Sequence, residues 1–202
     1  MYWLIAVLAV AILGLAYAVF NFVKVRILSE GTDEMSEIAA AIRTGANTFL
    51  VNEYRVLFTV VVVLAVVFWV FLSQSSAIAF LIGVAMSGAA GLIGMKMSTY
   101  ANVRVANTAR ETKDMSKTLN VAFRGGSVMG LSVSAFALIG LVIVFFLYKD
   151  QISELHAVAN WCGIEFVPFA MTLTSYSLGC SIVAIFNRVG GGIYTKAADM
   201  GA

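Results

Sequence analysis

The chain has 202 residues, of which 61% are hydrophobic and only 12% are charged, and its formal net charge is +2. Water-soluble domains carry about 25% charged residues, so this composition excludes a single soluble globular domain and indicates an integral membrane protein. The two cysteines, Cys162 and Cys180, match no disulfide or metal-ligand spacing, and we expect both to act as small apolar residues.

Five apolar stretches are long enough to cross a bilayer as helices, which takes about 20 residues. Apart from Lys96 near the end of the third stretch, none contains a charged side chain. The linker between the second and third stretches, residues 73–76, is short and uncharged, which predicts a tight hairpin. We expect membrane spans at residues 2–23, 56–72, 77–97, 128–147 and 167–186.

The first long connection, residues 24–55, has a helical pattern of its own. Apolar residues recur there at steps of three and four, which places them on one face of a helix. Thr32 or Asp33 could cap its first turn. Two arrangements fit the pattern: a long helix that rises out of the membrane, or a helix that lies flat at the lipid interface. The residues of this face are Met35, Ile38, Ile42, Ala46, Phe49 and Leu50.

The next long connection, residues 98–127, also keeps a helical pattern, with no proline or glycine before Gly125 and Gly126. We therefore expect a second long helix beyond the membrane. In the span that precedes it, Gly83, Ser87 and Gly91 lie four residues apart. Small residues at this spacing let the backbones of membrane helices approach closely, so we interpret them as packing positions rather than as part of an ion path.

The distribution of Lys and Arg predicts the orientation. Twelve of them lie in residues 24–55, in residues 96–127 or in the segment after residue 186, and one, Lys149, lies in the other connections. Because cytoplasmic loops carry the excess of Lys and Arg, the chain is predicted to have its N-terminus outside and its C-terminus in the cytoplasm. His156, beside Glu154 in the outer connection, is expected to be a solvated surface residue.

The segment RVGGGIYTKAADMGA, residues 188–202, permits two interpretations. Arg188 could be an interfacial cation, with the glycine triplet at residues 190–192 ending the helix. Alternatively the helix continues, and Lys196 and Asp199 share one face. A cation for phosphate beside a carboxylate for Mg²⁺ would suit a magnesium-phosphate substrate, although this is not a Walker A loop.

Ser181 lies seven residues before Arg188, which places it on the same face two turns away. A serine inside a membrane helix commonly bonds back to its own backbone. The alternative is a polar ligand on an ion path. Periodicity leaves both possibilities open.

The segment RVGGGIYTKAAD after GCSIVAIFN resembles the membrane-integral pyrophosphatases, ion pumps driven by pyrophosphate hydrolysis. The segments GTDEMSEIAAAIRTGANTFLVNEYR, GLIGMKMSTYANVRVANTAR and FRGGSVMGLSV are similar to this family as well. The resemblance covers essentially the whole chain. It implies that residues 188–202 begin the pyrophosphate-binding motif, in which Met200 replaces the usual valine, and that the chain is an N-terminal fragment.

The resemblance also implies roles for single residues. Lys196 is similar to the family's pyrophosphate-binding lysine and Asp199 to a Mg²⁺-binding aspartate. Arg188 matches an arginine of the coupling region below the site, and Ser181 a serine at the ion gate. No catalytic residue is assigned within the fragment.

We therefore expect an all-α integral membrane protein of five helices, forming the first part of a bundle of about sixteen. The resemblance implies a homodimeric pump in the cell membrane that couples hydrolysis of Mg-pyrophosphate to transport of H⁺ or Na⁺, with K⁺ as a candidate activator. The fragment alone is expected to be inactive. The alternatives are a fragment of a secondary transporter, which would place charges at mid-membrane in broken helices, and a structural membrane subunit without catalysis.

Overall fold

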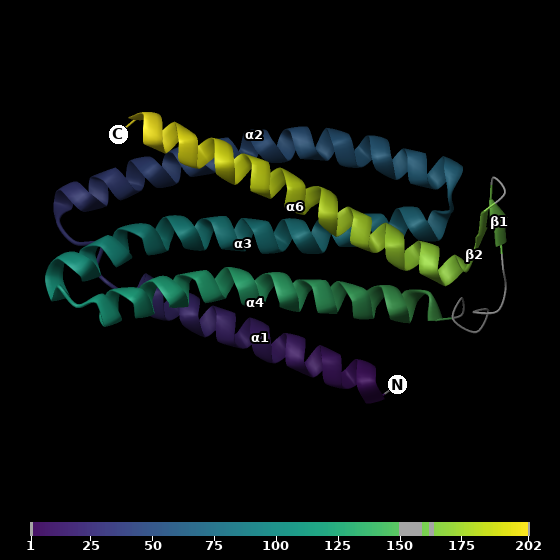
Figure 1. Cartoon of the computed structure of the whole chain (residues 1–202), viewed down its shortest axis with the longest axis horizontal. Coiled ribbons are helices and arrows are strands. Elements are labelled where there is room, and N and C mark those ends of the chain that lie inside the picture. Colours follow the sequence, from purple (N-terminus) through teal and green to yellow (C-terminus); the bar gives the residue numbers. More distant parts are fainter. Residues whose placement is uncertain (1, 150–158, 162–163, 202) are drawn as a thin grey trace.

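The computed structural model describes residues 2–149, 159–161 and 164–201. The expectations for Cys162 and His156 concern residues outside this part of the chain. The described elements, in chain order, are α1 (Tyr2–Arg26), α2 (Asp33–Phe71), α3 (Gln74–Thr112), α4 (Met115–Leu147), β1 (Ala159–Trp161), β2 (Ile164–Phe166) and α6 (Pro168–Gly201) (Figure 1).

The five helices run back and forth along one common axis, and each is long and apolar enough to cross a membrane (Figure 1). This confirms the predicted five-helix all-α membrane fold. The two ends of the chain lie at opposite ends of the bundle, as an odd number of spans requires. A short antiparallel hairpin, β1–β2, precedes α6 and was not predicted from the sequence; Ala159 pairs there with Phe166.

The helices are longer than the spans predicted for them. With 39 residues each, α2 and α3 extend about 58 Å, about twice the thickness of the hydrocarbon core. Because α2 runs without a break from Asp33 to Phe71, the segment before the second span continues that span, as in the rising arrangement, and is not a separate flat helix. Thr32 caps α2 by accepting a hydrogen bond from the Met35 backbone N–H at 3.4 Å, as predicted.

The helical pattern after the third span breaks earlier than expected. Lys113 adopts a left-handed backbone conformation, with φ of 50°, and ends α3. Asp114 then caps α4 by accepting a hydrogen bond from the Ser116 backbone N–H at 2.9 Å. The expectation of one helix as far as Gly125 was wrong, because this compact cap replaces the usual glycine signal. Gly125 instead lies inside α4, against the side chain of Ala101.

Helix α3 is the centre of the bundle and contacts all four other helices. It packs tightly against α6, where a side chain at Gly83 would collide with the backbone of Tyr176 and one at Gly179 with the backbone of Phe80. The Ser87 hydroxyl donates a hydrogen bond to the Cys180 carbonyl at 3.1 Å. The interpretation of the small residues of α3 as packing positions is thus confirmed.

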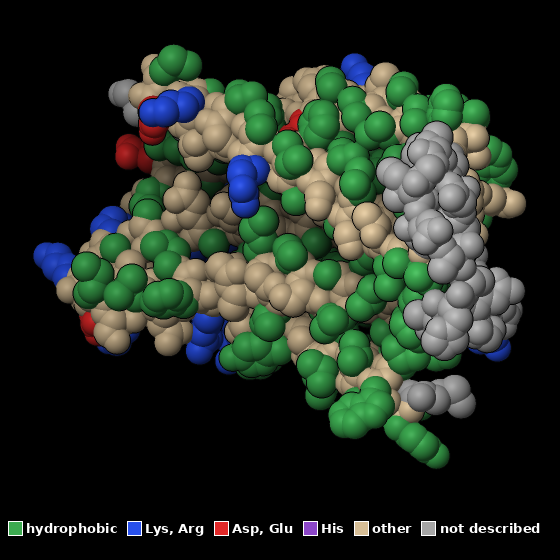
Figure 2. Space-filling model, turned by 45° about the vertical axis from the view of Figure 1, so that its right-hand side comes forward, with side chains coloured by type: hydrophobic (Ala, Val, Ile, Leu, Met, Phe, Trp, Pro, Cys, Tyr) green, Lys and Arg blue, Asp and Glu red, His purple; other side chains and the backbone are tan. Residues whose placement is uncertain are grey.

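Large apolar side chains cover the outside of the bundle. Trp3 and Phe58 are well exposed, while Phe80 and Val183 are fully buried. Figure 2 shows apolar side chains spread over the surface and most Lys and Arg side chains gathered toward one end. A surface of this kind suits a lipid environment between two polar boundaries.

Candidate functional site

The segment after the fifth span forms part of one helix. Helix α6 continues without a break through the glycine triplet to Gly201. The interpretation in which the glycines end the helix was therefore wrong. Gly190 is buried where α6 passes α2, so the first glycine of the triplet is a packing position inside the helix. A side chain at Gly191 or Gly192 would meet nothing within 4 Å.

The four predicted site residues lie on one face of α6. At about 100° per residue, Ser181 and Asp199 are separated by five full turns, and Arg188 deviates from the same line by about 20°. Lys196 stands about 60° to one side. All four are exposed in this chain: Ser181, Arg188, Lys196 and Asp199. We call this set the polar face of α6.

The opposite face of α6 packs against the bundle. Val183 is fully buried there, and Asn187 lies over Gly91 of α3. Farther along, the Tyr194 hydroxyl donates a hydrogen bond to the Ile42 carbonyl of α2 at 3.1 Å, and its ring lies 5.9 Å from that of Phe49. These contacts fix the rotation of α6 about its axis and thereby the direction of the polar face.

Lys196 and Asp199 form an ion pair on the polar face, with 3.5 Å between Nζ and Oδ2. Their side chains are 80% and 69% exposed, so the pair is open to a ligand. Asp199 offers a hard oxygen of the kind that Mg²⁺ prefers, but Mg²⁺ takes six ligands. No group of three or more His, Cys, Asp or Glu side chains that could hold a metal occurs among the described residues. Asp199 therefore fits one corner of a magnesium site.

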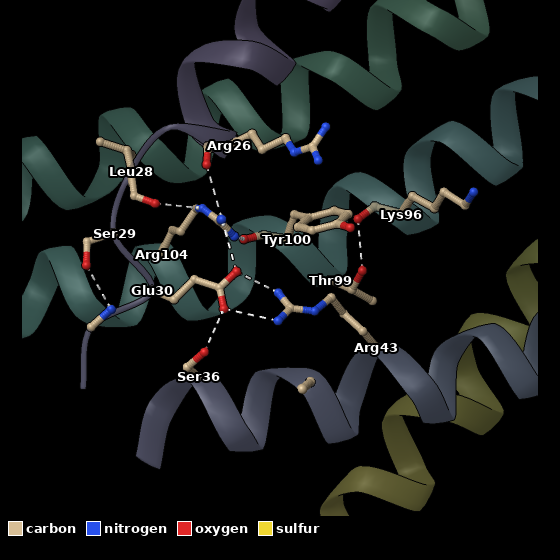
Figure 3. A network of polar contacts seen from close by, with 12 residues as sticks. Arg26, Leu28, Ser29, Glu30, Ser36, Arg43, Lys96, Thr99, Tyr100 and Arg104 are labelled. Atoms are coloured by element: carbon tan, nitrogen blue, oxygen red, sulfur yellow. Dashed lines mark hydrogen bonds and ion pairs between the residues drawn. The ribbon is translucent and has the colours of Figure 1, made fainter. Parts of the chain in front are cut away.

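A second polar cluster joins the loop between α1 and α2 to α3 (Figure 3). Arg43 donates two hydrogen bonds to Glu30, at 2.8 and 3.0 Å, and Arg104 forms an ion pair with the same carboxylate at 3.0 Å. Arg104 also donates to the backbone carbonyls of Arg26 and Leu28 at the end of α1, at 3.1 and 3.0 Å. We call this set the Glu30 cluster.

The Glu30 cluster is built around one aromatic ring. The guanidinium groups of Arg26, Arg43 and Arg104 lie 5.9, 5.3 and 5.6 Å from the centre of the Tyr100 ring. The hydrogen bonds from Arg43 lower the pKa of Glu30, and the charges of Arg43 and Arg104 act in the same direction, while burial opposes them. Glu30 is thus ionised at neutral pH and balances part of this positive charge.

Loss of Arg104 should destabilise the protein strongly. Its side chain is only 6% exposed, so Arg104→Ala would leave two backbone carbonyls at the end of α1 without their side-chain donor and would remove one of the two arginines paired with Glu30. We expect the free energy of unfolding in detergent to fall by about 3 kcal/mol. Lys117→Ala, at a side chain that is 69% exposed at the start of α4, should change it by less than about 0.5 kcal/mol.

The pH dependence of this effect has a definite sign. The pKa of Glu30 is lower in the folded state than in the unfolded state. The ionised carboxylate therefore stabilises the folded protein at pH values above its pKa in the unfolded state, and this stabilisation is lost as the pH falls through its pKa in the folded state. As the pH is lowered, the difference in the free energy of unfolding between the parent and Arg104→Ala should therefore become smaller. If this difference stays constant down to strongly acidic pH, the pairing of Arg104 with Glu30 is contradicted.

Nearly the whole chain matches one known protein family. The family model described as inorganic H+ pyrophosphatase matches residues 12–202. The chain belongs to this family.

Individual pyrophosphatases of the family are similar over nearly the full chain. The chain is 50% identical over 196 residues to the K(+)-stimulated pyrophosphate-energized sodium pump of Thermotoga maritima, covering 96% of this chain and 27% of that protein. It is 38% identical over 192 residues to the K(+)-insensitive pyrophosphate-energized proton pump 2 of Moorella thermoacetica, covering 95% and 26%. The chain thus spans about a quarter of the length of these relatives.

The structure also places polar residues that the sequence pattern did not predict. Arg104 lies in a connection rich in cations, yet it is buried, and its spacing of four residues from Tyr100 is the sequence signal for a shared helix face. Glu53 stands between two aliphatic segments, and no sequence signal places it beside Gly190. Asn187 precedes Arg188 directly, but it lies on the packed face.

Proposed function

We propose that this chain forms the first part of a pyrophosphate-energised pump, which couples hydrolysis of Mg-pyrophosphate to two phosphates with transport of H⁺ or Na⁺. Membership of the pyrophosphatase family and the names of its relatives support this assignment. In keeping with the resemblance, the complete pump is proposed to be a homodimer in the cell membrane.

One observation carries the proposal: the polar face of α6 is exposed although much of α6 lies at membrane depth. A hydroxyl and a guanidinium that faced lipid would be unfavourable, so such residues normally face protein or a water-filled cavity. Ser181 and Arg188 stand about 10 Å apart along the axis, and Asp199 about 16 Å beyond Arg188. These three polar side chains therefore lie at intervals along one line from the span toward the solvent.

The proposed roles follow the order of residues along this line. Lys196 binds a phosphate group of pyrophosphate as a point charge, and Asp199 supplies one oxygen ligand to Mg²⁺. Bound Mg²⁺ would neutralise phosphate charge and polarise the leaving group. Arg188 and Ser181, deeper in the membrane, belong to the coupling region and ion gate. K⁺ is a candidate activator, because relatives are named as K(+)-stimulated or K(+)-insensitive.

The chain alone is proposed to lack activity. The transition state of pyrophosphate hydrolysis carries dense negative charge, and its stabilisation needs several preorganised cations and metal ligands. The polar face offers one lysine and one carboxylate near the expected substrate position, Lys196 and Asp199. The remaining ligands would come from other segments of the pump.

The two alternative functions have less support. A secondary transporter would place charges at mid-membrane in interrupted helices, whereas α6 is continuous. A structural subunit gives no reason for a lysine and an aspartate paired beyond a glycine triplet. Both relatives named above are described as pyrophosphate-driven pumps.

A chimeric pump provides the direct test. In this chimera the chain replaces the matching segment of the Thermotoga maritima pump, to which it is 50% identical. After reconstitution into vesicles, addition of Mg-pyrophosphate should release phosphate and drive uptake of Na⁺ or H⁺. Uptake of Na⁺, vesicle acidification and their response to K⁺ are measured in parallel. Hydrolysis without uptake of either ion would contradict the proposed coupling.

The orientation is tested by labelling. The turn that contains Lys113 should face the cytoplasm together with most of the cations, so Lys117→Cys should react with an impermeant thiol reagent only after the cells are opened. Ser75→Cys, in the hairpin at the other end of the bundle, should react in intact cells. Labelling of Lys117→Cys in intact cells would contradict the proposed orientation and place Lys196 and Asp199 outside the cytoplasm.

Arg188→Ala should separate transport from hydrolysis. If Arg188 belongs to the coupling region, its loss in the chimera should lower ion uptake at least as much as phosphate release. The measurement is the number of ions taken up per pyrophosphate hydrolysed. Arg188→Lys keeps a charge but not the planar fork of donors, and it should restore the ratio only in part. An unchanged ratio in Arg188→Ala would favour a simple interfacial cation.

A further inference from the structure

Glu53 on α2 is a buried carboxylate with no partner in the described part of the chain. Both of its carboxylate oxygens are closed off from solvent, and neither forms a hydrogen bond with a described residue. Buried polar groups are nearly always hydrogen-bonded, and a buried charge without a partner is strongly unfavourable. No interaction described above accounts for this side chain.

Its neighbour fixes its depth in the bundle. The hydroxyl of Tyr54 donates a hydrogen bond to the carbonyl of Gly88 at 3.0 Å. Gly88 lies inside the span predicted at residues 77–97, and Glu53 lies three residues before the span predicted at residues 56–72, so its carboxyl group stands near the boundary of the membrane-spanning part of the bundle. A buried carboxyl group without a partner at this place calls for a functional explanation.

The carboxyl group of Glu53 faces the first glycine of the triplet. A side chain at Gly190 would collide with the carboxyl group, whereas one at Gly191 or Gly192 would meet nothing within 4 Å. The carboxyl group therefore occupies the space that a side chain at position 190 would need. Gly190 precedes Lys196 by six residues, or about 9 Å along α6.

The surroundings favour an uncharged carboxyl group. None of the ion pairs among the described residues includes Glu53. A bound metal cation would need further ligands, and no group of three acidic, His or Cys side chains occurs in the described part of the chain. A protonated carboxyl group avoids the cost of a buried charge.

We propose that Glu53, in its uncharged form, is a positioning residue for the pyrophosphate site: its carboxyl group fills the notch at Gly190 and fixes α6 so that Lys196 and Asp199 face the substrate. This inference rests on the proposed function of the polar face. Glu53 does not touch the substrate and acts through the position of α6.

The test uses the chimeric pump and separates shape from charge. Glu53→Gln keeps the size without the charge, so kcat and KM for Mg-pyrophosphate should stay within about twofold of the parent. Glu53→Ala opens the notch and should raise KM on the order of tenfold or more, whereas Gly190→Ala pushes aside the flexible end of the Glu53 side chain and should raise KM by a smaller factor. Gly191→Ala is the matched control and should have no effect. The impairment by Gly190→Ala should shrink when Glu53→Ala is also present.

Two results would overturn the proposal. If Glu53→Gln is as harmful as Glu53→Ala, an ionised carboxylate is required and the residue is a cation ligand. If Gly190→Ala and Gly191→Ala behave alike, the contact does not position α6. Thermal unfolding of the 202-residue chain, measured for the parent, Glu53→Ala, Gly190→Ala and the double variant, tests the contact without any measurement of activity. If the effects of the two substitutions on the unfolding temperature are non-additive but the chimera binds no pyrophosphate, the proposed function is refuted and the contact between Glu53 and Gly190 is retained.

Discussion

Lys196→Ala and Asp199→Ala should each lower pyrophosphate hydrolysis by the chimeric pump by about 10²–10³-fold, the loss typical of removing one preorganised electrostatic contact to a transition state. The two side chains lie 3.5 Å apart on the exposed polar face of α6, so each can reach the same ligand. In the proposed roles, Lys196→Ala removes a contact to phosphate and Asp199→Ala removes a ligand of Mg²⁺. Phosphate release at saturating and at limiting Mg²⁺ is the measurement.

The Mg²⁺ dependence distinguishes the two roles. Asp199→Ala should shift the requirement to higher Mg²⁺, whereas excess Mg²⁺ should not rescue Lys196→Ala. Met200→Ala is the matched control, because Met200 is 84% exposed on the same turn and carries no charge. The chain without the rest of the pump should release no phosphate. If the isolated chain releases phosphate in the presence of Mg²⁺ and Asp199→Ala abolishes this release, the proposal that the site needs ligands from other segments of the pump is wrong.

Gly179→Ala should disrupt the bundle more than any other single methyl group added to α6. A Cβ atom at this position collides with the carbonyl of Phe80 and approaches the backbone N of Val84 at 3.1 Å. Backbone atoms of a packed helix cannot move aside as a flexible side chain can, so α3 and α6 must separate. We expect the free energy of unfolding in mixed micelles to fall by more than about 2 kcal/mol.

Gly83→Ala should have a similar effect, since its added methyl group collides with the backbone of Tyr176 from the other side of the same crossing. Gly130→Ala on α4 is the control, because nothing lies within 4 Å of an added Cβ there. That variant should be unchanged or more stable by up to about 1 kcal/mol, as alanine favours helix. Equal stability of Gly179→Ala and Gly130→Ala would refute the close crossing.

The spans and the small-residue crossing were predictable because hydrophobic length and residue size act locally along the chain. The cap at Thr32 was predictable for the same reason. The turn at Lys113 was not, because a left-handed lysine followed by an aspartate cap leaves only a weak signal in sequence. Whether glycines end a helix depends on what packs against them.

The site shows the same division between local and long-range information. The shared face of Ser181, Arg188 and Asp199 follows from spacing alone once the helix continues. The burial of Arg104 and of Glu53 depends on residues dozens of positions away, Leu28 and Gly190. Such pairings are properties of the folded bundle and cannot be read from one segment.

The continuity of α6 has a mechanical consequence. A helix that is intact from Pro168 to Gly201 is a rod of about 50 Å, so a push at one end is transmitted to the other with little loss. The packed face of this rod is held on both sides of Gly190, by the buried Val183 and by the hydrogen bond from Tyr194 to the Ile42 carbonyl of α2. A tilt or twist produced by a ligand at the proposed site, Lys196 and Asp199, would therefore also displace Arg188 and Ser181.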